Sequence, residues 1–563
     1  MNHRYEAWKT HAVLDSHTQS QLLNLTPSEI EECFGAHVEF GTAGMRGLLG
    51  PGPNRLNLVT IRKATVGFVS YIKRIQEDDE SLSGVAIAYD NRTMSREFAY
   101  ESAATLASYG ITSYVYESLR STPQLSFTVR ELKCAGGIMI TASHNPKEYN
   151  GFKVYDKTGC QLVPKDIDQV IKAIGNIQDE LAIVVADHHY LSPLIRKVDP
   201  SVDKLYQKKV IDIALRPEVN KDIKIVFTSV HGAGYPVVPD VLTTSGYHVI
   251  NVEDQIIHDP LFSNTKSPNP EEAIAYERAI EVGLEHDAHI LLCTDPDADR
   301  MGVVVKHQGN YQLLSGNQTG AIIIEYLLST LKEKHLLKEK SVIFNTIVTS
   351  DLPEKVAEHY GVEVEKTLTG FKFIGEKIEE YSKTKEKHFV LGFEESYGYL
   401  VESFVRDKDA VQACLLLAEA AAYYASKQQT LVDVLDMLTK RHGYYYDTQT
   451  SLTLKGIEGS AKIKAIMKGL RDHPLTHIGP LKVIKQQDYD SLIETIDGVK
   501  TPLKGFVNAD VLKYFLENGS WVAVRPSGTE PKCKFYYCVK GDTQREAEEL
   551  FEQCQSTMAS VVS

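Results

Sequence analysis

The chain has 563 residues, of which 43% are hydrophobic and 24% are charged. This composition supplies apolar side chains for several packed cores, so it excludes an intrinsically disordered protein, and the length predicts about four domains. The formal net charge of −14 repels polyanions, which excludes broad binding of nucleic acid or of an anionic membrane surface.

The opening segment MNHRYEAWKT lacks the apolar core of a signal peptide, and Glu419 interrupts the most apolar later stretch, CLLLAEAAAYYA. Eight cysteines are scattered without a Cys-x-x-Cys pair, a pattern typical of reduced thiols. These observations favour a soluble, cytoplasmic protein. We expect most of the cysteines to be small buried hydrophobic residues.

Short β-rich runs alternate with stretches of helical periodicity along most of the chain. This alternation is typical of parallel or mixed sheets covered by helices, so it predicts an α/β fold. The predicted strands are residues 84–90, 136–143, 223–230, 289–295, 342–348 and 388–394, and the clearest helices are residues 318–334 and 409–428. The pattern indicates one α/β architecture used about three times, around a central cleft.

The character of the sequence changes after residue 440. There the segments RHGYYYDTQTSLTLKG and WVAVRPSGTEPKCKFYYCVKG predict strands joined by a polar loop, and TQREAEELFEQCQSTM predicts a closing helix. We therefore expect a smaller α+β domain at the end of the chain. The predicted domains are residues 1–200, 201–310 and 311–440, each α/β, and residues 441–563.

Four predicted strands run directly into polar or glycine-bearing segments, ITASHNP, TSVHGAG, CTDPDADR and LGFEESYG. In open α/β sheets, ligands bind at the carboxyl ends of strands. The first of these segments carries Ser143, which is either a turn residue or a nucleophile. No Gly-x-Ser-x-Gly elbow surrounds it, so the α/β-hydrolase context is missing. We expect His144 to orient or polarise the serine, whereas Lys153 either returns to the same site or is a solvated surface residue.

The segment CTDPDADR carries Asp295, Asp297 and Asp299, separated by single residues. In an extended backbone the period of two places all three carboxylates on one side. Clustered carboxylates repel one another unless a cation lies among them, and oxygen ligands suit Mg²⁺ or Mn²⁺. An EF-hand is excluded, because Arg300 stands where glycine is needed and Lys306 where glutamate is needed. The alternative is a solvated acidic turn.

The segment RPSGTEPK has the composition of a phosphate-binding loop. Arg525 can grip two phosphate oxygens, Ser527 and Thr529 offer hydroxyls, and Gly528 lets backbone N–H groups approach. The alternative is a hairpin turn built from proline and glycine. None of the 37 glycines is followed by lysine, so a Walker A loop is missing and ATP is not the expected phosphoryl donor.

Two further segments offer polar side chains. In GFEESYG, Glu394 and Ser396 follow a strand and are suited to vicinal sugar hydroxyls, with a capping turn as the alternative. The glycine-dense FGTAGMRGLLGPGP places Arg46 on what we expect to be a mobile loop, with a purely structural loop as the alternative.

Together these motifs resemble the α-D-phosphohexomutases, specifically their phosphoglucomutase-like members. TASHNPKEYNGFK resembles the phosphoserine loop of that family, DPDADR its metal loop, GFEESYG its sugar loop and RPSGTEPK its phosphate loop. The order matches and the resemblance spans nearly the whole chain. It implies three similar α/β domains and a smaller fourth domain that carries the phosphate loop.

The resemblance also implies roles for individual residues. Ser143 would carry the phosphoryl group, and its phosphate would complete the shell of one Mg²⁺ held by Asp295, Asp297 and Asp299. Arg46 and Lys153 match positions near the transferring group, with Lys153 the better general acid or base, and we group His144 with them as catalytic. The implied sugar contacts are Arg300, Thr369, Glu394, Ser396 and Lys408, and the phosphate contacts are Arg525, Ser527, Gly528 and Thr529.

The implied reaction is the reversible interconversion of α-D-glucose 1-phosphate and glucose 6-phosphate, with glucose 1,6-bisphosphate as intermediate and activator. Mannose or pentose phosphates are alternative substrates, since GFEESYG keeps a Glu-x-Ser pair but differs from the GEMSGH form of dual mannose/glucose enzymes. A serine phosphatase and a noncatalytic sugar-phosphate sensor are the rival classes; separate sugar and phosphate loops favour the mutase. Sugar phosphates are the expected partners, and the oligomeric state is not predicted.

Overall fold

A computed structural model describes residues 3–11, 14, 16–41, 44–454, 456–526 and 532–562. The chain divides into two compact units. Unit one comprises Met1–Gly316, Lys338–Val342 and Phe371–Thr430, and unit two comprises Asn317–Leu337, Ile343–Gly370 and Leu431–Ser563. None of the described helices has the length and apolar character needed to cross a membrane.

Unit one begins with a seven-stranded sheet in the order β1-β2-β6-β5-β3-β4-β7. Strands β3, β4, β5 and β7 are parallel to their neighbours in this group, whereas β6 runs antiparallel to both β5 and β2. The strands are β1 (Phe40–Gly41), β2 (Gly44–Leu48), β3 (Ser83–Tyr89), β4 (Ser113–Val115), β5 (Cys134–Ile140), β6 (Tyr149–Asp156) and β7 (Ile195–Lys197).

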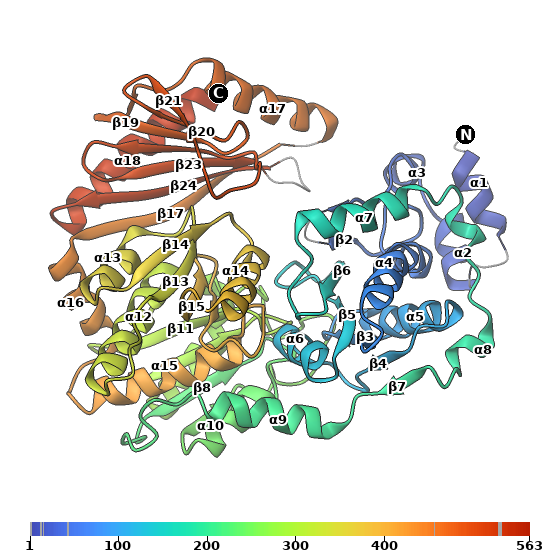
Figure 1. Ribbon diagram of the computed structural model, residues 1–563, viewed down its shortest axis with the longest axis horizontal. Coiled ribbons are helices and arrows are strands. Elements are labelled where there is room, and N and C mark those ends of the chain that lie inside the picture. The colour runs from blue at the N-terminus through green and yellow to red at the C-terminus, as the bar shows by residue number, and fades with distance from the viewer. Residues whose placement is uncertain are drawn as a thin grey trace. The chain divides into compact units, whose positions relative to one another are not determined.

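Helices lie beside this sheet and share its apolar core (Figure 1). Asn57 and Ser121 begin α4 and α6 with capping boxes, each accepting a hydrogen bond from the N3 backbone of its helix. The helices of this part are α1 (His3–Thr10), α2 (Ser16–Leu23), α3 (Pro27–Phe34), α4 (Leu58–Asp78), α5 (Ser95–Ser108), α6 (Thr122–Glu131), α7 (Pro164–Gly175), α8 (Asp187–Tyr190) and the 3₁₀ turn η1 (Glu180–Ala182). Helices α1 to α3 pack around a small core that includes Trp8 and Phe34, and Val59 of α4 and Leu181 of η1 contribute to it.

A second sheet in unit one has the order β12-β11-β10-β8-β9. Strands β10, β8 and β9 are parallel, and β11 and β12 add antiparallel pairs. The elements are α9 (Pro200–Ile211), β8 (Lys224–Thr228), α10 (Val237–Thr244), β9 (His248–Asn251), η2 (Ala273–Tyr276), α11 (Glu277–His286), β10 (Ile290–Thr294), β11 (Met301–His307) and β12 (Asn310–Leu313).

Unit one ends with α14 (Phe371–Thr384), the antiparallel pair β15 (His388–Glu394) and β16 (Gly398–Leu400), and α15 (Ala410–Ala425). Helix α15 contains the most apolar stretch of the sequence and is buried along nearly its whole length. The cost of burying the Glu419 carboxylate in this helix is offset, because the carboxylate accepts hydrogen bonds of 2.9 Å from the backbone N–H groups of Leu215 and Arg216.

Unit two contains an antiparallel sheet in the order β17-β24-β23-β22-β19-β20-β21, with β18 paired to β19. Its strands are β17 (Tyr444–Thr453), β18 (His477–Ile478), β19 (Leu481–Asp488), β20 (Ile493–Ile496), β21 (Val499–Pro502), β22 (Leu512–Leu516), β23 (Trp521–Pro526) and β24 (Lys532–Gly541). The unit also holds all or most of α12 (Gly316–Glu333), β13 (Ser341–Thr346), α13 (Asp351–His359), β14 (Glu363–Thr367), α16 (Leu431–His442), α17 (Gly456–Asp472) and α18 (Gln544–Val562).

The predicted strands are confirmed as β3, β5, β8, β10, β13 and β15, and the two clearest helices as α12 and α15. The predictions run too far at some carboxyl ends: β5 stops at Ile140, before Ser143, and β10 stops at Thr294. The polar residues there leave the sheet and form loops. All eight cysteines are buried, as expected.

Candidate active site

Ser143 lies in the loop between β5 and β6 and is 3% exposed. Its backbone has a φ of 53°, which is uncommon for a residue with a side chain. The Ser143 hydroxyl donates a hydrogen bond of 2.7 Å to Oδ2 of Asp295 and lies 3.2 Å from Nδ1 of His144. The strained turn therefore presents the hydroxyl to two groups able to bind it or take its proton.

Arg92 fixes the backbone of the Ser143 loop. Its guanidinium donates to the backbone carbonyls of Ser143, Asn145, Pro146 and Tyr149, at 2.6 Å for Asn145 and 2.9 Å for Pro146. Because the guanidinium group is planar and rigid, its hydrogen bonds to four backbone carbonyls restrict the movement of the loop. Arg92 is thus a positioning residue for the serine.

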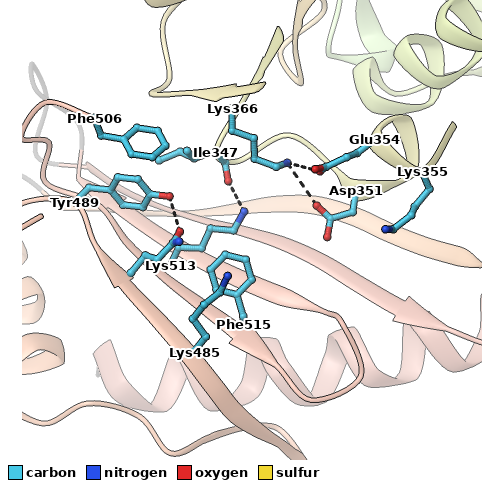
Figure 2. Close-up of a pocket in the computed structure, with 11 residues that line it drawn as sticks. Ile347, Asp351, Glu354, Lys355, Lys366, Lys485, Tyr489, Phe506, Lys513 and Phe515 are labelled. Atoms are coloured by element: carbon cyan, nitrogen blue, oxygen red, sulfur yellow. Dashed lines mark hydrogen bonds and ion pairs between the residues drawn. The ribbon is translucent and has the colours of Figure 1, made fainter. Parts of the chain in front are cut away.

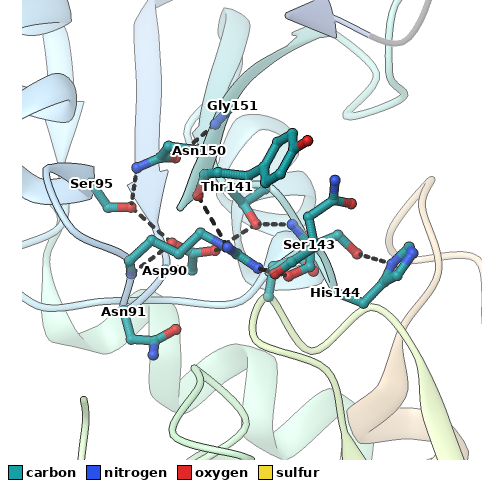
Figure 3. Close-up of polar contacts among 12 residues, drawn as sticks. Asp90, Asn91, Ser95, Thr141, Ser143, His144, Asn150 and Gly151 are labelled. Atoms are coloured by element: carbon teal, nitrogen blue, oxygen red, sulfur yellow. Dashed lines mark hydrogen bonds and ion pairs between the residues drawn. The ribbon is translucent and has the colours of Figure 1, made fainter. Parts of the chain in front are cut away.

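Asp90, at the carboxyl end of β3, pairs with Arg92 in turn. Figure 3 shows Asp90 beside Ser95 and Thr141. Its carboxylate pairs with Nε of Arg92 at 3.2 Å and accepts hydrogen bonds from Thr141 at 2.6 Å and Ser95 at 2.8 Å. Both charged side chains are fully buried. Burial raises the pKa of Asp90, and Arg92 offsets part of this effect.

The sequence analysis missed Asp90 and Arg92, although a signal was present. Asp90 is the last residue of the predicted strand 84–90, and Arg92 lies two residues beyond it. Because β3 is parallel to β5, the carboxyl ends of the two strands lie at the same edge of the sheet. Asp90 and Arg92 therefore lie at the same edge of the sheet as Ser143, as expected for polar residues at the end of a strand.

The metal loop follows β10, and one detail of its prediction is wrong. Residues 295–299 form a turn rather than an extended segment, and Ala298 has a φ of 49°. The three carboxylates converge because the chain curls around them, not because of strand alternation. Backbone N–H groups of Ala233, Thr122 and Ala410 bind the carbonyls of Pro296, Asp297 and Ala298, at 2.8, 2.8 and 3.2 Å.

The Asp295, Asp297 and Asp299 carboxylates fit a divalent cation. Each offers one oxygen, and these oxygens lie within 4.8 Å of one another. The three residues are 0%, 0% and 2% exposed, which contradicts the alternative of a solvated acidic turn. Within the part of the chain that the structure describes, Oδ1 of Asp297 and Oδ1 of Asp299 are buried without a hydrogen-bond partner. Burial raises the pKa of Asp295 well above its ordinary value, and repulsion by the other two carboxylates adds to the effect; a cation would relieve both.

Two lysines supply positive charge at the same loop. Lys153, on β6, has its Nζ 2.9 Å from Oδ2 of Asp297 and 3.7 Å from Oδ2 of Asp299. Lys408 has its Nζ 3.1 Å from Oδ2 of Asp299 and 3.2 Å from Oδ1 of Asp407. Burial opposes the charge on Lys153, but the two aspartates raise its pKa above the ordinary value. Lys153 is 8% exposed, so the solvated-lysine alternative is wrong.

Thr122 is a further residue that the sequence analysis missed. Its hydroxyl donates a hydrogen bond of 2.7 Å to Oδ2 of Asp297, the oxygen that also binds Lys153. Thr122 is the first residue of α6. The sequence carries no local sign of this contact, because the two residues are 175 positions apart.

Arg46 was expected on a mobile loop, and that expectation is wrong. It lies on β2, opposite Gly151 of β6, and donates a hydrogen bond of 3.0 Å to Oδ1 of Asn145. The neighbouring glycine permits close pairing rather than mobility: Gly44 has a φ of 89°, and a Cβ there would lie 2.3 Å from the carbonyl oxygen of Phe152.

The β15–β16 connection lies against the metal loop. Glu394 ends β15 and is buried, Ser396 lies in the turn, and the backbone N–H of Met301 donates to the Tyr397 carbonyl at 3.0 Å. Arg300 forms a bridge with Gly398 and an ion pair of 2.6 Å with Glu271.

The predicted site residues fall into three groups. Unit one brings its members to one set of neighbouring loops and strand ends: Arg46, Ser143, His144, Lys153, Asp295, Asp297, Asp299, Arg300, Glu394, Ser396 and Lys408. Thr369, which follows β14, and Arg525, on β23, belong to unit two. Ser527, Gly528 and Thr529 lie outside the described residues.

A buried serine beside an aspartate cluster and two lysines has the groups that a metal-assisted phosphoryl-transfer enzyme requires. Family models described as phosphoglucomutase/phosphomannomutase alpha/beta/alpha domains I, II and III match residues 37–181, 199–309 and 315–441, and the model of the C-terminal domain matches residues 482–555. These matches confirm the predicted fold class.

Individual proteins agree with the family models. The phosphoglucomutase of Staphylococcus aureus strain USA300 is 38% identical over 520 residues, which cover 91% of this chain and 92% of that protein. A phosphoglucomutase structure from Paramecium has a TM-score of 0.66 at 19% identity, covering 94% of this chain and 95% of that chain. An Aspergillus fumigatus N-acetylphosphoglucosamine mutase in complex with GlcNAc-6P and magnesium has a TM-score of 0.52 at 13% identity, covering 94% and 97%. The chain belongs to the phosphoglucomutase/phosphomannomutase family of phosphohexomutase enzymes.

Proposed function

We propose that the chain is a phosphoglucomutase, which interconverts α-D-glucose 1-phosphate and glucose 6-phosphate through a phosphoserine at Ser143. The observation that carries the proposal is the 2.7 Å contact between the Ser143 hydroxyl and Asp295, within a buried aspartate cluster. The 38% identity to a phosphoglucomutase over nearly the whole chain supports glucose as the sugar.

The reaction needs two transfers. The 1-phosphate cannot migrate directly to the distant 6-hydroxyl, so phosphorylated Ser143 first gives its phosphoryl group to the free hydroxyl of the sugar. This forms glucose 1,6-bisphosphate, which turns over in the site. The other phosphate then returns to the Ser143 oxygen, and the isomer is released.

The side chains of unit one supply positioning, charge and a proton site. Arg92 fixes the backbone of the Ser143 loop, and Lys153 holds a proton beside the metal loop, where it serves as general acid or base for the reacting hydroxyls. Arg46 adds positive charge near the phosphoryl group, which spreads its charge over several oxygens in the transition state. His144, whose pKa is well below its ordinary value because of burial and the nearby Arg300 and Arg46, lies with Nδ1 3.2 Å from the Ser143 hydroxyl oxygen and orients that side chain.

Asp295, Asp297 and Asp299 would hold one Mg²⁺, together with an oxygen of the Ser143 phosphate. When bound, the cation neutralises charge on the phosphoryl oxygens. The unpartnered oxygens of Asp297 and Asp299 support this assignment. The A. fumigatus relative with magnesium and a sugar phosphate supports the choice of ion.

The substrate contacts complete the proposal. We assign the sugar hydroxyls to Arg300, Thr369, Glu394, Ser396 and Lys408, and the nonreacting phosphate to Arg525, Ser527, Gly528 and Thr529. The Thr369 hydroxyl oxygen is buried and has no hydrogen-bond partner among the residues that the structure describes, which supports a role in binding. We also propose, from the sequence, domain boundaries near residues 200, 310 and 440. A cytoplasmic location is proposed on the same basis.

Relative kcat/KM values for glucose 1-phosphate, mannose 1-phosphate and ribose 1-phosphate, with catalytic glucose 1,6-bisphosphate supplied, test the substrate. We expect glucose 1-phosphate to be preferred by at least tenfold, the scale of one well-placed hydroxyl contact. A preference for mannose or ribose 1-phosphate would instead support a phosphomannomutase or phosphopentomutase. Free phosphate measured in the same assay separates a mutase from a phosphatase.

A further inference from the structure

Unit two contains a cavity of about 360 Å³ that includes none of the proposed active-site residues (Figure 2). One wall comes from α13, β14 and Ile347, which lies before α13. The other wall comes from β19 and β22, together with Tyr489 and Phe506 from loops. The cavity volume is within the range of sites that hold small metabolites. Four of its lining residues are lysines and three carry aromatic rings, against two carboxylates.

Lys513 is the central charged group of the cavity. It lies on β22, is 1% exposed, and donates a hydrogen bond of 2.6 Å to the backbone carbonyl of Ile347. Its ammonium lies 3.8 Å from the ring centroid of Trp521 and 5.0 Å from that of Phe515. Among the described residues no carboxylate forms an ion pair with it, which is unusual because buried charges are normally paired.

The two carboxylates that line the cavity form ion pairs with another lysine. Lys366 pairs with Glu354 at 2.9 Å and with Asp351 at 3.6 Å. Figure 2 shows Lys366 and Lys513 directed toward the same space from opposite walls. Lys485 adds a third cation 3.9 Å from the ring centroid of Phe515. The lining therefore has more cationic than anionic groups around its centre.

The protonation of Lys513 reflects this excess. Burial lowers the pKa of Lys513 to about 7, and repulsion by Lys366 adds to the effect. Asp351, Cys538 and Glu354 act in the opposite direction without cancelling it. An anion placed in the cavity would stabilise the charged form of Lys513, so its binding would take up a proton.

We propose that this cavity binds a phosphate monoester of pentose-phosphate to mononucleotide size. The phosphate dianion lies between the ammonium groups of Lys513, Lys366 and Lys485, because lysine provides a point charge for phosphate. The organic part packs against the rings of Phe515, Phe506 and Tyr489, which line the same cavity. This site is separate from the proposed mutase site, so the two proposals stand or fall independently.

Calorimetric titration of the full-length protein tests the proposal. AMP, ribose 5-phosphate and inorganic phosphate are titrated in turn at pH 7, and the same titrations of Lys513→Met separate binding in this cavity from binding at the mutase site. We expect AMP or ribose 5-phosphate to bind at one site, at least tenfold more tightly than inorganic phosphate. Titrations in two buffers of different ionisation enthalpy should reveal proton uptake. The ester that binds more tightly identifies the source as nucleotide or sugar.

Two variants locate the site, and one is a matched control. Lys513→Met removes a buried positive charge and keeps a side chain of similar length. Lys485→Met removes the positive charge of a partly exposed side chain. Both should weaken ester binding by at least tenfold and leave mutase activity unchanged, whereas Lys500→Met, on exposed β21, should bind as the unmodified protein does. Absence of binding by both esters, equal affinity for inorganic phosphate, or unchanged affinity in the folded Lys513 and Lys485 variants would overturn the proposal.

Discussion

Lys153 donates a hydrogen bond of 2.9 Å to Oδ2 of Asp297, across 144 positions of the chain. The contact joins a strand of the first sheet to the loop after β10 of the second, so the proton carrier and the metal loop are held by separate elements. Neither group is stable in this buried position without a partner, because isolated charges are costly away from water.

Replacing Ser143 with alanine removes the proposed phosphoryl carrier. We expect isomerisation to fall by at least a thousandfold even with glucose 1,6-bisphosphate supplied, because alanine has no oxygen that could accept the phosphoryl group. A coupled assay for glucose 6-phosphate measures the rate, and peptide mass spectrometry locates the phosphate. Ser81→Ala, at an exposed position, is the control. Normal turnover by Ser143→Ala would refute the covalent scheme.

Asp297→Asn tests the metal loop. The change keeps the shape of the side chain but removes a charge that the cluster needs to hold a divalent cation. We expect turnover to fall and the Mg²⁺ concentration for half-maximal activity to rise by at least tenfold. Titration of Mg²⁺ into chelator-treated protein measures this shift, and Asp287→Asn, at an exposed position after α11, should leave it unchanged. An unaltered Mg²⁺ response in Asp297→Asn would contradict the assignment.

Arg92→Met removes the guanidinium group that binds the Ser143 loop, and it leaves the Asp90 carboxylate buried without its ion-pair partner. We expect the free energy of unfolding to fall by about 3–5 kcal/mol, and kcat to fall more than the affinity for substrate. Urea denaturation and steady-state kinetics measure the two effects. Arg96→Met, at an exposed position on α5, is the control.

A double variant separates the ion pair from the loop contacts. Asp90→Asn combined with Arg92→Met should lose less stability than the sum of the single changes, because the uncompensated charge is gone. Its kcat should stay low, since the carbonyl contacts are still missing. Additive losses of stability would show that the two side chains do not depend on each other.

Gly398→Ala tests the position of Lys408. A Cβ at Gly398 would lie 2.0 Å from Cδ of Lys408, so the lysine must move away from Asp299. We expect kcat/KM to fall about tenfold, the effect of weakening one charge contact at the reacting group. Gly469→Ala, in α17 with open space around the new methyl group, is the control and should retain activity. Equal activity of the two variants would argue against a role for Lys408.

Asp409, the N-cap of α15, predicts a pH effect on stability. Burial raises the pKa of its carboxyl from 3.8 to about 6, despite hydrogen bonds from Gln412 and Tyr206. Below pH 3.8 both states of the protein hold this proton. As the pH rises toward 6 the unfolded state releases it first, so the free energy of unfolding decreases, by about 3 kcal/mol in total. Above pH 6 the loss is constant.

The measurement compares the unmodified protein with Asp409→Asn by urea denaturation across this pH range. The amide does not titrate, so the difference between the two free energies of unfolding should change by about 3 kcal/mol from pH 3.8 to about pH 6. A difference that stays constant with pH would show that the carboxyl titrates normally in the folded state.

Most of the strands and the metal loop were predictable, because their signals are local. Hydrophobic alternation and strand-end polar residues are visible within short windows of sequence. Thr122 was not predicted, since its partner Asp297 lies 175 positions along the chain. Arg92 was missed although it lies just after a predicted strand, because its role depends on backbone carbonyls of another loop. Arg46 was misplaced because a glycine-rich segment suggests mobility, whereas Gly44 permits close pairing of β2 with β6.

The amino-acid sequence alone determined which chemical groups the protein has and the order in which they occur: a serine, three spaced aspartates, and the motifs that indicate the family. Only the tertiary structure decided that Lys153 and Lys513 are buried, that Asp295 meets Ser143, and that Arg92 holds the serine loop. The reason is physical: residue types and spacing are local properties, whereas burial, distance and the resulting pKa shifts arise from contacts between segments that are remote in the chain.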